Sequence, residues 1–254
     1  MEQLEALRNS VTRLRAIVEG FDADQLRARA YPAEWSVADV LSHIGSSGVI
    51  LQSRLDATLA GRELAEGFEP PIWDEWNAKS PDAKAADALV ADRAFLEAVD
   101  ALDESQRATV RVTIGPLNLD LAALVGLRLN EHALHTWDVE VVVDPNATVP
   151  VDAASVVIDN LDLIVRFAGR PTGEEHDVNV HTTNPARDFT LTLGSDGLAL
   201  SRARDLVPNR PLPDLELSAD AFIRLVYGRF DPAHASTVRG DASLDELRRA
   251  FPGV

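Results

Sequence analysis

The 254-residue sequence contains no cysteine. Disulfides, thiolate metal sites and a cysteine nucleophile carried by the chain are therefore excluded. Lysine is almost absent as well, since Lys79 and Lys84 are the only two. The longest apolar stretches, such as residues 139–143, are far too short to span a bilayer. Because the N-terminal segment is acidic and amphipathic, it is not typical of a signal peptide, and we expect a cytoplasmic protein with no membrane partner.

The chain contains far fewer basic residues than acidic ones. Asp and Glu together number 41 against 24 Lys and Arg, which gives a formal net charge of -17. This balance disfavours binding to nucleic acid and to anionic membrane surfaces. Hydrophobic residues make up 46% and charged residues 26%, a composition typical of globular proteins. The length allows one large domain or two ordinary ones.

Four long amphipathic helices are predicted in the first 150 residues, where apolar residues recur at spacings of three and four. Ser36 and Asp39 form a capping box at one helix start, and Ser80 followed by Pro81 marks another. The predicted helices cover residues 4–18, 36–60, 81–102 and 118–143, with an extended segment at 109–116. Residues 1–150 are therefore expected to form a four-helix bundle.

The pattern changes after Pro150. A helix is predicted at residues 152–168, and apolar residues then alternate with polar ones, as in strands, at 178–182, 189–193 and 198–200. Further strands are predicted at residues 215–217 and at Val238, with helices at 218–227 and 241–250. Residues 151–254 are therefore expected to form a smaller α+β domain with an antiparallel sheet, so that the fold class is α plus α+β.

The segment 130–138, NEHALHTWD, is the most informative for function. Glu131 and His135 are four residues apart, so they share one helical face, and that face carries the apolar stripe of the predicted helix. A buried carboxylate beside a buried imidazole needs partners, and a divalent metal would be one. His132 lies at the edge of the same stripe, so spacing alone does not choose between Glu131/His135 and His132/His135. A simple hydrogen bond within the helix is the structural alternative.

His43 is the natural third ligand, because it flanks the apolar stripe of its own predicted helix. Two histidines and a carboxylate form a three-ligand set that suits zinc or another divalent ion with open coordination positions. A water or thiol bound there would lose its proton near neutral pH and become a nucleophile. Since the sequence has no cysteine, any thiol must come from a cosubstrate.

Two segments in the first half resemble one family. Residues 33–43, AEWSVADVLSH, resemble the W-S-x-x-D-x-x-x-H motif of the metal-binding domain of the mycothiol-dependent maleylpyruvate isomerase family, which belongs to the DinB-like helical bundles. Residues 131–138 resemble the E-x-x-x-H-x-x-D segment of that domain. Residues 217–229 and 238–241 resemble the sterol-carrier-like C-terminal domain of the same family. The similarity covers nearly the whole chain.

The resemblance implies that His43, Glu131 and His135 bind a divalent metal, usually Zn²⁺, and it favours Glu131 over His132. It also implies an enzyme that uses mycothiol for isomerisation or thiol transfer on a small, anionic substrate. In such an isomerase the thiolate adds to an activated cis double bond, and rotation followed by elimination gives the trans product. Arg229 falls where the family has a Gly-Arg pair and is the candidate catalytic contact to the substrate. Its alternative role is to cap the end of a helix.

Other interpretations stay open. Asp138 could orient His135 as a ligand or form an ordinary surface salt bridge. A closed site with His132 as fourth ligand would favour a structural metal, and with it a non-enzymatic ligand-binding or regulatory module. A metal-assisted hydrolase would use water in place of thiol. The four tryptophans are expected in core or interdomain packing, although one of them could line the pocket.

Overall fold

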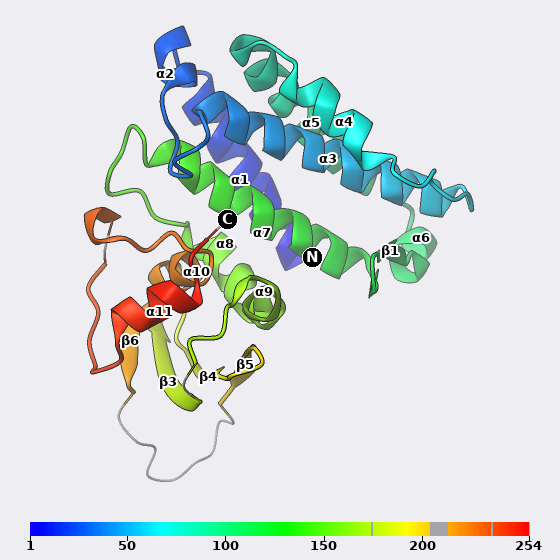
Figure 1. Ribbon diagram of the computed structural model, residues 1–254. Coiled ribbons are helices and arrows are strands. Elements are labelled where there is room, and N and C mark those ends of the chain that lie inside the picture. Colours follow the sequence, from blue (N-terminus) through cyan, green and yellow to red (C-terminus); the bar gives the residue numbers. More distant parts are fainter. Residues whose placement is uncertain (174, 204–212, 235, 254) are drawn as a thin grey trace. The chain divides into compact units, whose positions relative to one another are not determined.

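The computed structural model describes residues 1–173, 175–203, 213–234 and 236–253. The chain divides into two compact units, Met1–Ala147 and Thr148–Val254. The first unit is built mainly from helices, and the second combines helices with a four-stranded sheet (Figure 1). The fold class is therefore confirmed: helices dominate, and a smaller α+β part follows. No helix among the described residues is both long and apolar enough to cross a membrane.

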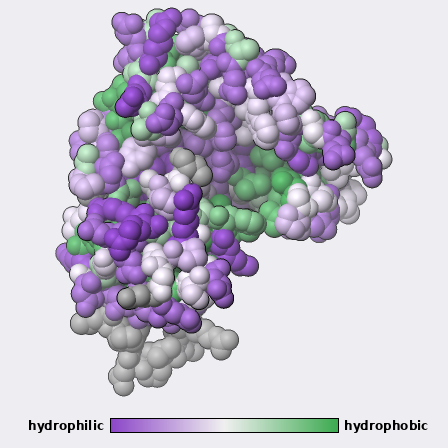
Figure 2. Space-filling view, in the orientation of Figure 1, coloured by the Kyte–Doolittle hydropathy of each residue, from purple (hydrophilic) through white to green (hydrophobic). Residues whose placement is uncertain are grey.

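Four long helices form the frame of the first unit. They are α1 (Glu2–Val18), α3 (Val37–Leu59), α5 (Pro81–Asp100) and α7 (Leu121–Glu140). Helix α3 packs against both α5 and α7, and α1 packs against α7. Helix α3 begins where predicted, because the Ser36 hydroxyl accepts the Asp39 backbone N–H at 3.2 Å and the Asp39 carboxylate accepts the Ser36 N–H at 3.0 Å. Hydrophilic side chains dominate the visible face of this unit (Figure 2), in keeping with the high charge.

Several short elements join the long helices. They are α2 (Ala23–Arg27), α4 (Glu69–Asn77), α6 (Glu104–Thr109) and the hairpin of β1 (Val112–Ile114) with β2 (Leu117–Leu119). The predicted start of the last long helix at residue 118 was wrong, because residues 117–119 pair as β2. The Asp120 side chain instead caps α7 by accepting the Ala123 N–H at 2.9 Å.

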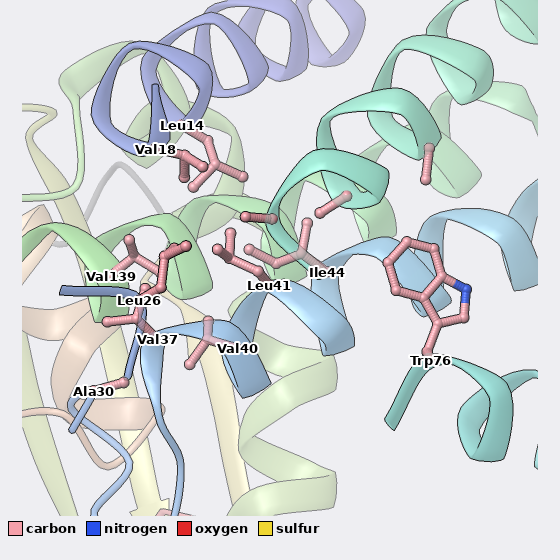
Figure 3. Close-up of a cluster of buried hydrophobic side chains, with 13 residues drawn as sticks. Leu14, Val18, Leu26, Ala30, Val37, Val40, Leu41, Ile44, Trp76 and Val139 are labelled. Carbon is pink, nitrogen blue, oxygen red and sulfur yellow. The ribbon is translucent and has the colours of Figure 1, made fainter. Parts of the chain in front are cut away.

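The core of the first unit lies where α1, α2, α3, α5 and α7 meet (Figure 3). Its buried side chains include Leu14 of α1, Leu41 and Ile44 of α3, and Val139 of α7. Helix α4 adds Trp76, whose ring lies against α3 at a glycine. A Cβ atom at that position, Gly45, would come within 2.2 Å of the ring. Only glycine therefore lets α4 pack this closely on α3.

Where the structure describes it, the second unit contains one sheet and several short helices. They are α8 (Val151–Val157), a 3₁₀ turn (Ile158–Asn160), α9 (Leu161–Ala168), β3 (His176–Thr183), β4 (Arg187–Leu193), β5 (Leu198–Arg202), β6 (Leu215–Ser218), α10 (Ala219–Val226), a second 3₁₀ turn (Pro232–His234) and α11 (Leu244–Ala250). The single helix predicted at 152–168 is thus divided into two by a tighter turn.

The sheet has the strand order β5-β4-β3-β6. The expectation of an antiparallel sheet holds for the first three strands, but β6 runs parallel to β3, so the sheet is mixed. An antiparallel sheet would follow if each strand paired with its neighbour in sequence. Strand β6 instead pairs with β3 and not with β5, the strand before it in the sequence, and β6 runs in the same direction as β3. The short strand expected at Val238 is reduced to a bridge between Arg239 and Glu216. Helix α10 packs against β6 and β3 and is buried along its length.

Candidate metal centre

His43 and Glu131 come from different helices and meet inside the first unit. His43 lies on α3, two turns after the Ser36–Asp39 cap, and Glu131 lies in the middle of α7. The His43 Nε2 atom is 3.3 Å from Glu131 Oε2, and His135 Nε2 is 3.7 Å from the same oxygen. The three candidate ligand atoms all lie within 4.8 Å of one another. The structure therefore brings together the three side chains singled out as ligands.

The spacing of these atoms fits a small divalent ion. Zinc binds nitrogen and oxygen ligands at about 2.0–2.1 Å in tetrahedral geometry, which places neighbouring ligand atoms roughly 3.3 Å apart. The two contacts to Glu131, at 3.3 and 3.7 Å, are close to that spacing, and all three ligand atoms lie within 4.8 Å of one another. The side chains of His43 and Glu131 are each 34% exposed, whereas that of His135 is 10% exposed. The cluster is thus reachable from one side, as an open coordination position requires.

His132 does not join this cluster. Its ring is fully buried, with Nε2 3.1 Å from the Asp92 carboxylate of α5 and Nδ1 2.8 Å from the Ser10 hydroxyl of α1. Both ring nitrogens are therefore occupied on another face of α7. Of the two pairs that spacing left open, Glu131/His135 is the one that faces His43. The placement of His132 does not match the closed four-ligand site considered above.

Asp138 contacts the His135 ring on the side that faces away from Glu131. Its buried carboxylate lies 2.8 Å from His135 Nδ1. A carboxylate only accepts hydrogen bonds, so Nδ1 carries the proton and Nε2 is left to face Glu131. Metal-binding histidines are typically oriented by a carboxylate in this way. Of the two roles considered for Asp138, the ligand-orienting geometry is the one present.

The electrostatics of the cluster favour the forms that bind metal. Burial lowers the pKa of His43, and the hydrogen bond with Glu131 offsets this only in part. Burial of Glu131 opposes its ionisation, but the neighbouring His135 and His43 side chains outweigh that effect and hold the pKa of the carboxyl far below its usual range. A neutral imidazole and an ionised carboxylate are the protonation states that bind a divalent ion.

A pocket of about 560 Å³ opens beside His43. Trp35, Trp73 and Asn77 line it together with His43. The Trp35 ring lies 5.4 Å from the His43 ring and is stacked on the His135 ring at 6.1 Å. Two of the four tryptophans, which were expected in packing, therefore line the pocket. The sequence signal for Trp35 at this site was its position eight residues before His43. The volume admits a small organic molecule next to the cluster.

Arg229 lies in the second unit, directly after the left-handed Gly228 that follows α10. Its side chain is 4% exposed, and its Nη1 donates to the backbone carbonyl of Tyr227, the last residue of the helix cap, at 2.6 Å. This bond is the one expected from the helix-capping interpretation. The catalytic role of Arg229 stays a prediction.

Comparison with known proteins agrees with these features. The family model of the mycothiol maleylpyruvate isomerase N-terminal domain matches residues 7–140. Crystal structures of a mycothiol-dependent maleylpyruvate isomerase and of a histidine-to-alanine mutant of it share the fold, with TM-scores of 0.65 and 0.66. Each is 13% identical to this chain and covers 93% of it and 91% of its own length. No curated protein matches the chain. The matched segment spans more than half of the sequence, and the chain belongs to the mycothiol maleylpyruvate isomerase N-terminal domain family.

Proposed function

We propose that this protein is a divalent-metal-dependent enzyme that uses a low-molecular-weight thiol, mycothiol, for isomerisation or thiol transfer on a small anionic substrate. The observation that carries the proposal is the convergence of His43, Glu131 and His135 within 4.8 Å. The name of the structurally similar protein, a mycothiol-dependent maleylpyruvate isomerase, supports the choice of thiol and reaction class. Zn²⁺ is the proposed ion, since histidine and carboxylate ligands suit it.

Each residue of the site has a separate role in this proposal. His43, Glu131 and His135 would hold the ion, and a bound divalent ion supplies a lowered thiol pKa, which gives a thiolate near neutral pH. Asp138 keeps the His135 ring turned toward the site. Trp35 and Trp73 form apolar walls of the adjoining pocket, and such walls exclude water from a bound substrate. Because the sequence has no cysteine, the thiol is supplied from outside.

We further propose Arg229 as the cation that contacts an anionic group of the substrate. Its match to the Gly-Arg pair of the family supports this role, and its bond to the Tyr227 carbonyl supports the capping alternative. Replacing Arg229 with Lys separates the two roles. A substrate contact would be seen as a raised KM for a dicarboxylate at unchanged thermal stability, whereas a cap would be seen as lowered stability at unchanged KM.

Metal binding is tested first by elemental analysis and by Co²⁺ titration of the apoprotein, followed through Trp fluorescence. The Trp35 ring lies 5.4 and 6.1 Å from the two histidine rings, so a bound Co²⁺ should quench its emission. His43→Ala should lower metal content substantially, and the matched control His181→Ala, whose ring is bonded to Asp188 in the second unit, should not. Unchanged metal stoichiometry in His43→Ala would remove His43 from the ligand set.

The reaction class is tested by adding mycothiol and maleylpyruvate to the metal-loaded protein and recording product formation. Isomerisation or thiol transfer that requires both metal and thiol supports the proposal. A metal-loaded protein that binds no mycothiol and turns over no unsaturated acid contradicts it, and points to the non-enzymatic module. Turnover of an ester or amide without thiol would instead identify a hydrolase.

A further inference from the structure

A charged network lies in the interior of the first unit, next to the metal centre but separate from it. Arg128 of α7 donates from Nη2 to Asp92 of α5 at 2.6 Å, and the other oxygen of that carboxylate is 3.1 Å from His132 Nε2. The three side chains are at most 1% exposed. Burial opposes ionisation of Asp92, but His132 and Arg128 outweigh it and lower the pKa of the carboxyl. Buried charges persist only where each has partners of this kind.

The network reaches two further helices. Arg128 Nη1 donates to the Ser47 hydroxyl of α3 at 2.6 Å, and His132 Nδ1 is 2.8 Å from Ser10 of α1. The Ser47 hydroxyl proton is directed to the Ile44 carbonyl at 3.1 Å, so the oxygen is oriented to accept the guanidinium. Four long helices are thus joined by one set of hydrogen bonds.

The link between Arg128 and Ser47 lies one helical turn from the contact that builds the metal centre. Ser47 is four residues after His43 on α3, and Arg128 is three residues before Glu131 on α7. The glycine after Ser47, Gly48, leaves room for the guanidinium, since a Cβ there would be 3.2 Å from Arg128 Nη2. Arg128 therefore fixes how far α3 can slide or rotate against α7 at this level.

We propose that Arg128, held by Asp92 and bonded to Ser47, is a positioning residue that sets His43 at binding distance from Glu131 and His135. The inference rests on the proposed metal site. A ligand set spread over two helices binds an ion tightly only if the helices are already in register, because any adjustment costs binding free energy. Loss of the Arg128–Ser47 bond should therefore weaken ion binding in a protein that is still folded. A network that serves stability alone would leave the affinity of the folded protein unchanged.

Ser47→Ala is the variant that removes this link with the least disturbance. We expect its Co²⁺ affinity, measured by calorimetric titration, to fall about tenfold, the lower end of what orienting partners contribute, and the visible spectrum of bound Co²⁺ to change. Ser47→Thr keeps a hydroxyl and should restore both. The matched control is Ser10→Ala, which cuts the same network at α1 and should leave Co²⁺ affinity and spectrum unchanged.

The Co²⁺ titrations distinguish failure of the proposed metal site from failure of the positioning role of Arg128. If the wild-type protein binds no Co²⁺, or His43→Ala binds it as well as the wild type, the proposed metal site is wrong and the inference falls with it. If the wild type binds Co²⁺ and Ser47→Ala has the same affinity and spectrum, only the positioning role of Arg128 is overturned. An equal loss in Ser10→Ala and Ser47→Ala likewise overturns it, because the effect would then come from general loosening of the bundle.

Discussion

In each unit an arginine is buried against an aspartate, and the two pairs are placed differently. In the first unit Arg128 and Asp92 are 36 residues apart and come from different helices. In the second unit Arg224 and Asp220 are four residues apart on α10, with two contacts of 2.9 and 3.1 Å. Both arginines are at most 2% exposed. The same ion pair therefore joins two separate helices in one unit and lies within a single helix in the other.

The remaining bonds of the two arginines extend this difference. Arg128 continues to a side chain on a third helix, Ser47. Arg224 instead donates to the backbone carbonyls of Arg229 and His234 and to the Ser236 hydroxyl, all in the segment that follows its own helix. Arg128 therefore bears on the relative position of the helices that carry the candidate ligands, whereas Arg224 bears on the segment that follows one helix. The predictions below test whether this distinction holds.

The largest effect is expected for Arg128→Met. This change removes the arginine partner of the fully buried Asp92 carboxylate, and breaking a buried ion pair from one side typically costs about 3–5 kcal/mol. We expect the free energy of unfolding, from urea denaturation at neutral pH, to fall by about that amount. A loss below about 1 kcal/mol would show that Asp92 is satisfied without Arg128, contrary to the arrangement of the network.

A smaller loss is expected for Arg224→Met. The Asp220 side chain is 9% exposed, whereas that of Asp92 is fully buried, and Asp220 also accepts the Val149 backbone N–H at 2.7 Å. We therefore expect a loss of about 2–3 kcal/mol, below the value for a buried charge left without partners. Hydrogen exchange should lose protection in α10 and the turn after it, and Co²⁺ affinity should stay at the wild-type value. Weaker Co²⁺ binding in Arg224→Met would break the comparison, since this arginine would then act beyond its own turn.

The sequence predicted the long helices and the candidate ligands because their signals are local. The Ser36–Asp39 cap and the i,i+4 spacing of Glu131 and His135 are properties of single helices. The capping boxes of α2 and α6, each an Asp followed three residues later by Gln, were also local signals but preceded no apolar stripe. Elements of five or six residues have no room for one.

What the sequence left open depends on which helices meet. Glu131 and His132 were equally compatible with the spacing, and the direction in which His132 turns depends on its partners on other helices, Asp92 of α5 and Ser10 of α1. Arg128 lies on the apolar stripe of α7, and a charged residue there predicts a buried partner without naming it. The parallel pairing of β6 with β3 was missed for the same reason, since strand order is not a local property.

The smallest effect is expected at an exposed ion pair of the second unit, Asp159 with Arg187 and Arg202. The Arg187 Nε atom is 2.9 Å from the carboxylate, and Arg202 contacts the same oxygen. Burial opposes ionisation of Asp159, but the two arginines outweigh it and lower its pKa. The side chain is 35% exposed, so solvent screening limits the contribution to less than about 1 kcal/mol.

Because the pKa of Asp159 is lower in the folded state, its ion pairs stabilise the protein above the unfolded-state pKa of about 3.9, and the contribution disappears as pH falls through the folded-state value. Asp159→Asn should therefore be slightly less stable than the wild type at pH 7, and the difference should shrink between about pH 4 and pH 2. Urea denaturation of both proteins across this range measures it. A difference that stays constant with pH would mean that Asp159 contributes through packing, and the contrast between exposed and buried pairs would lose its electrostatic basis.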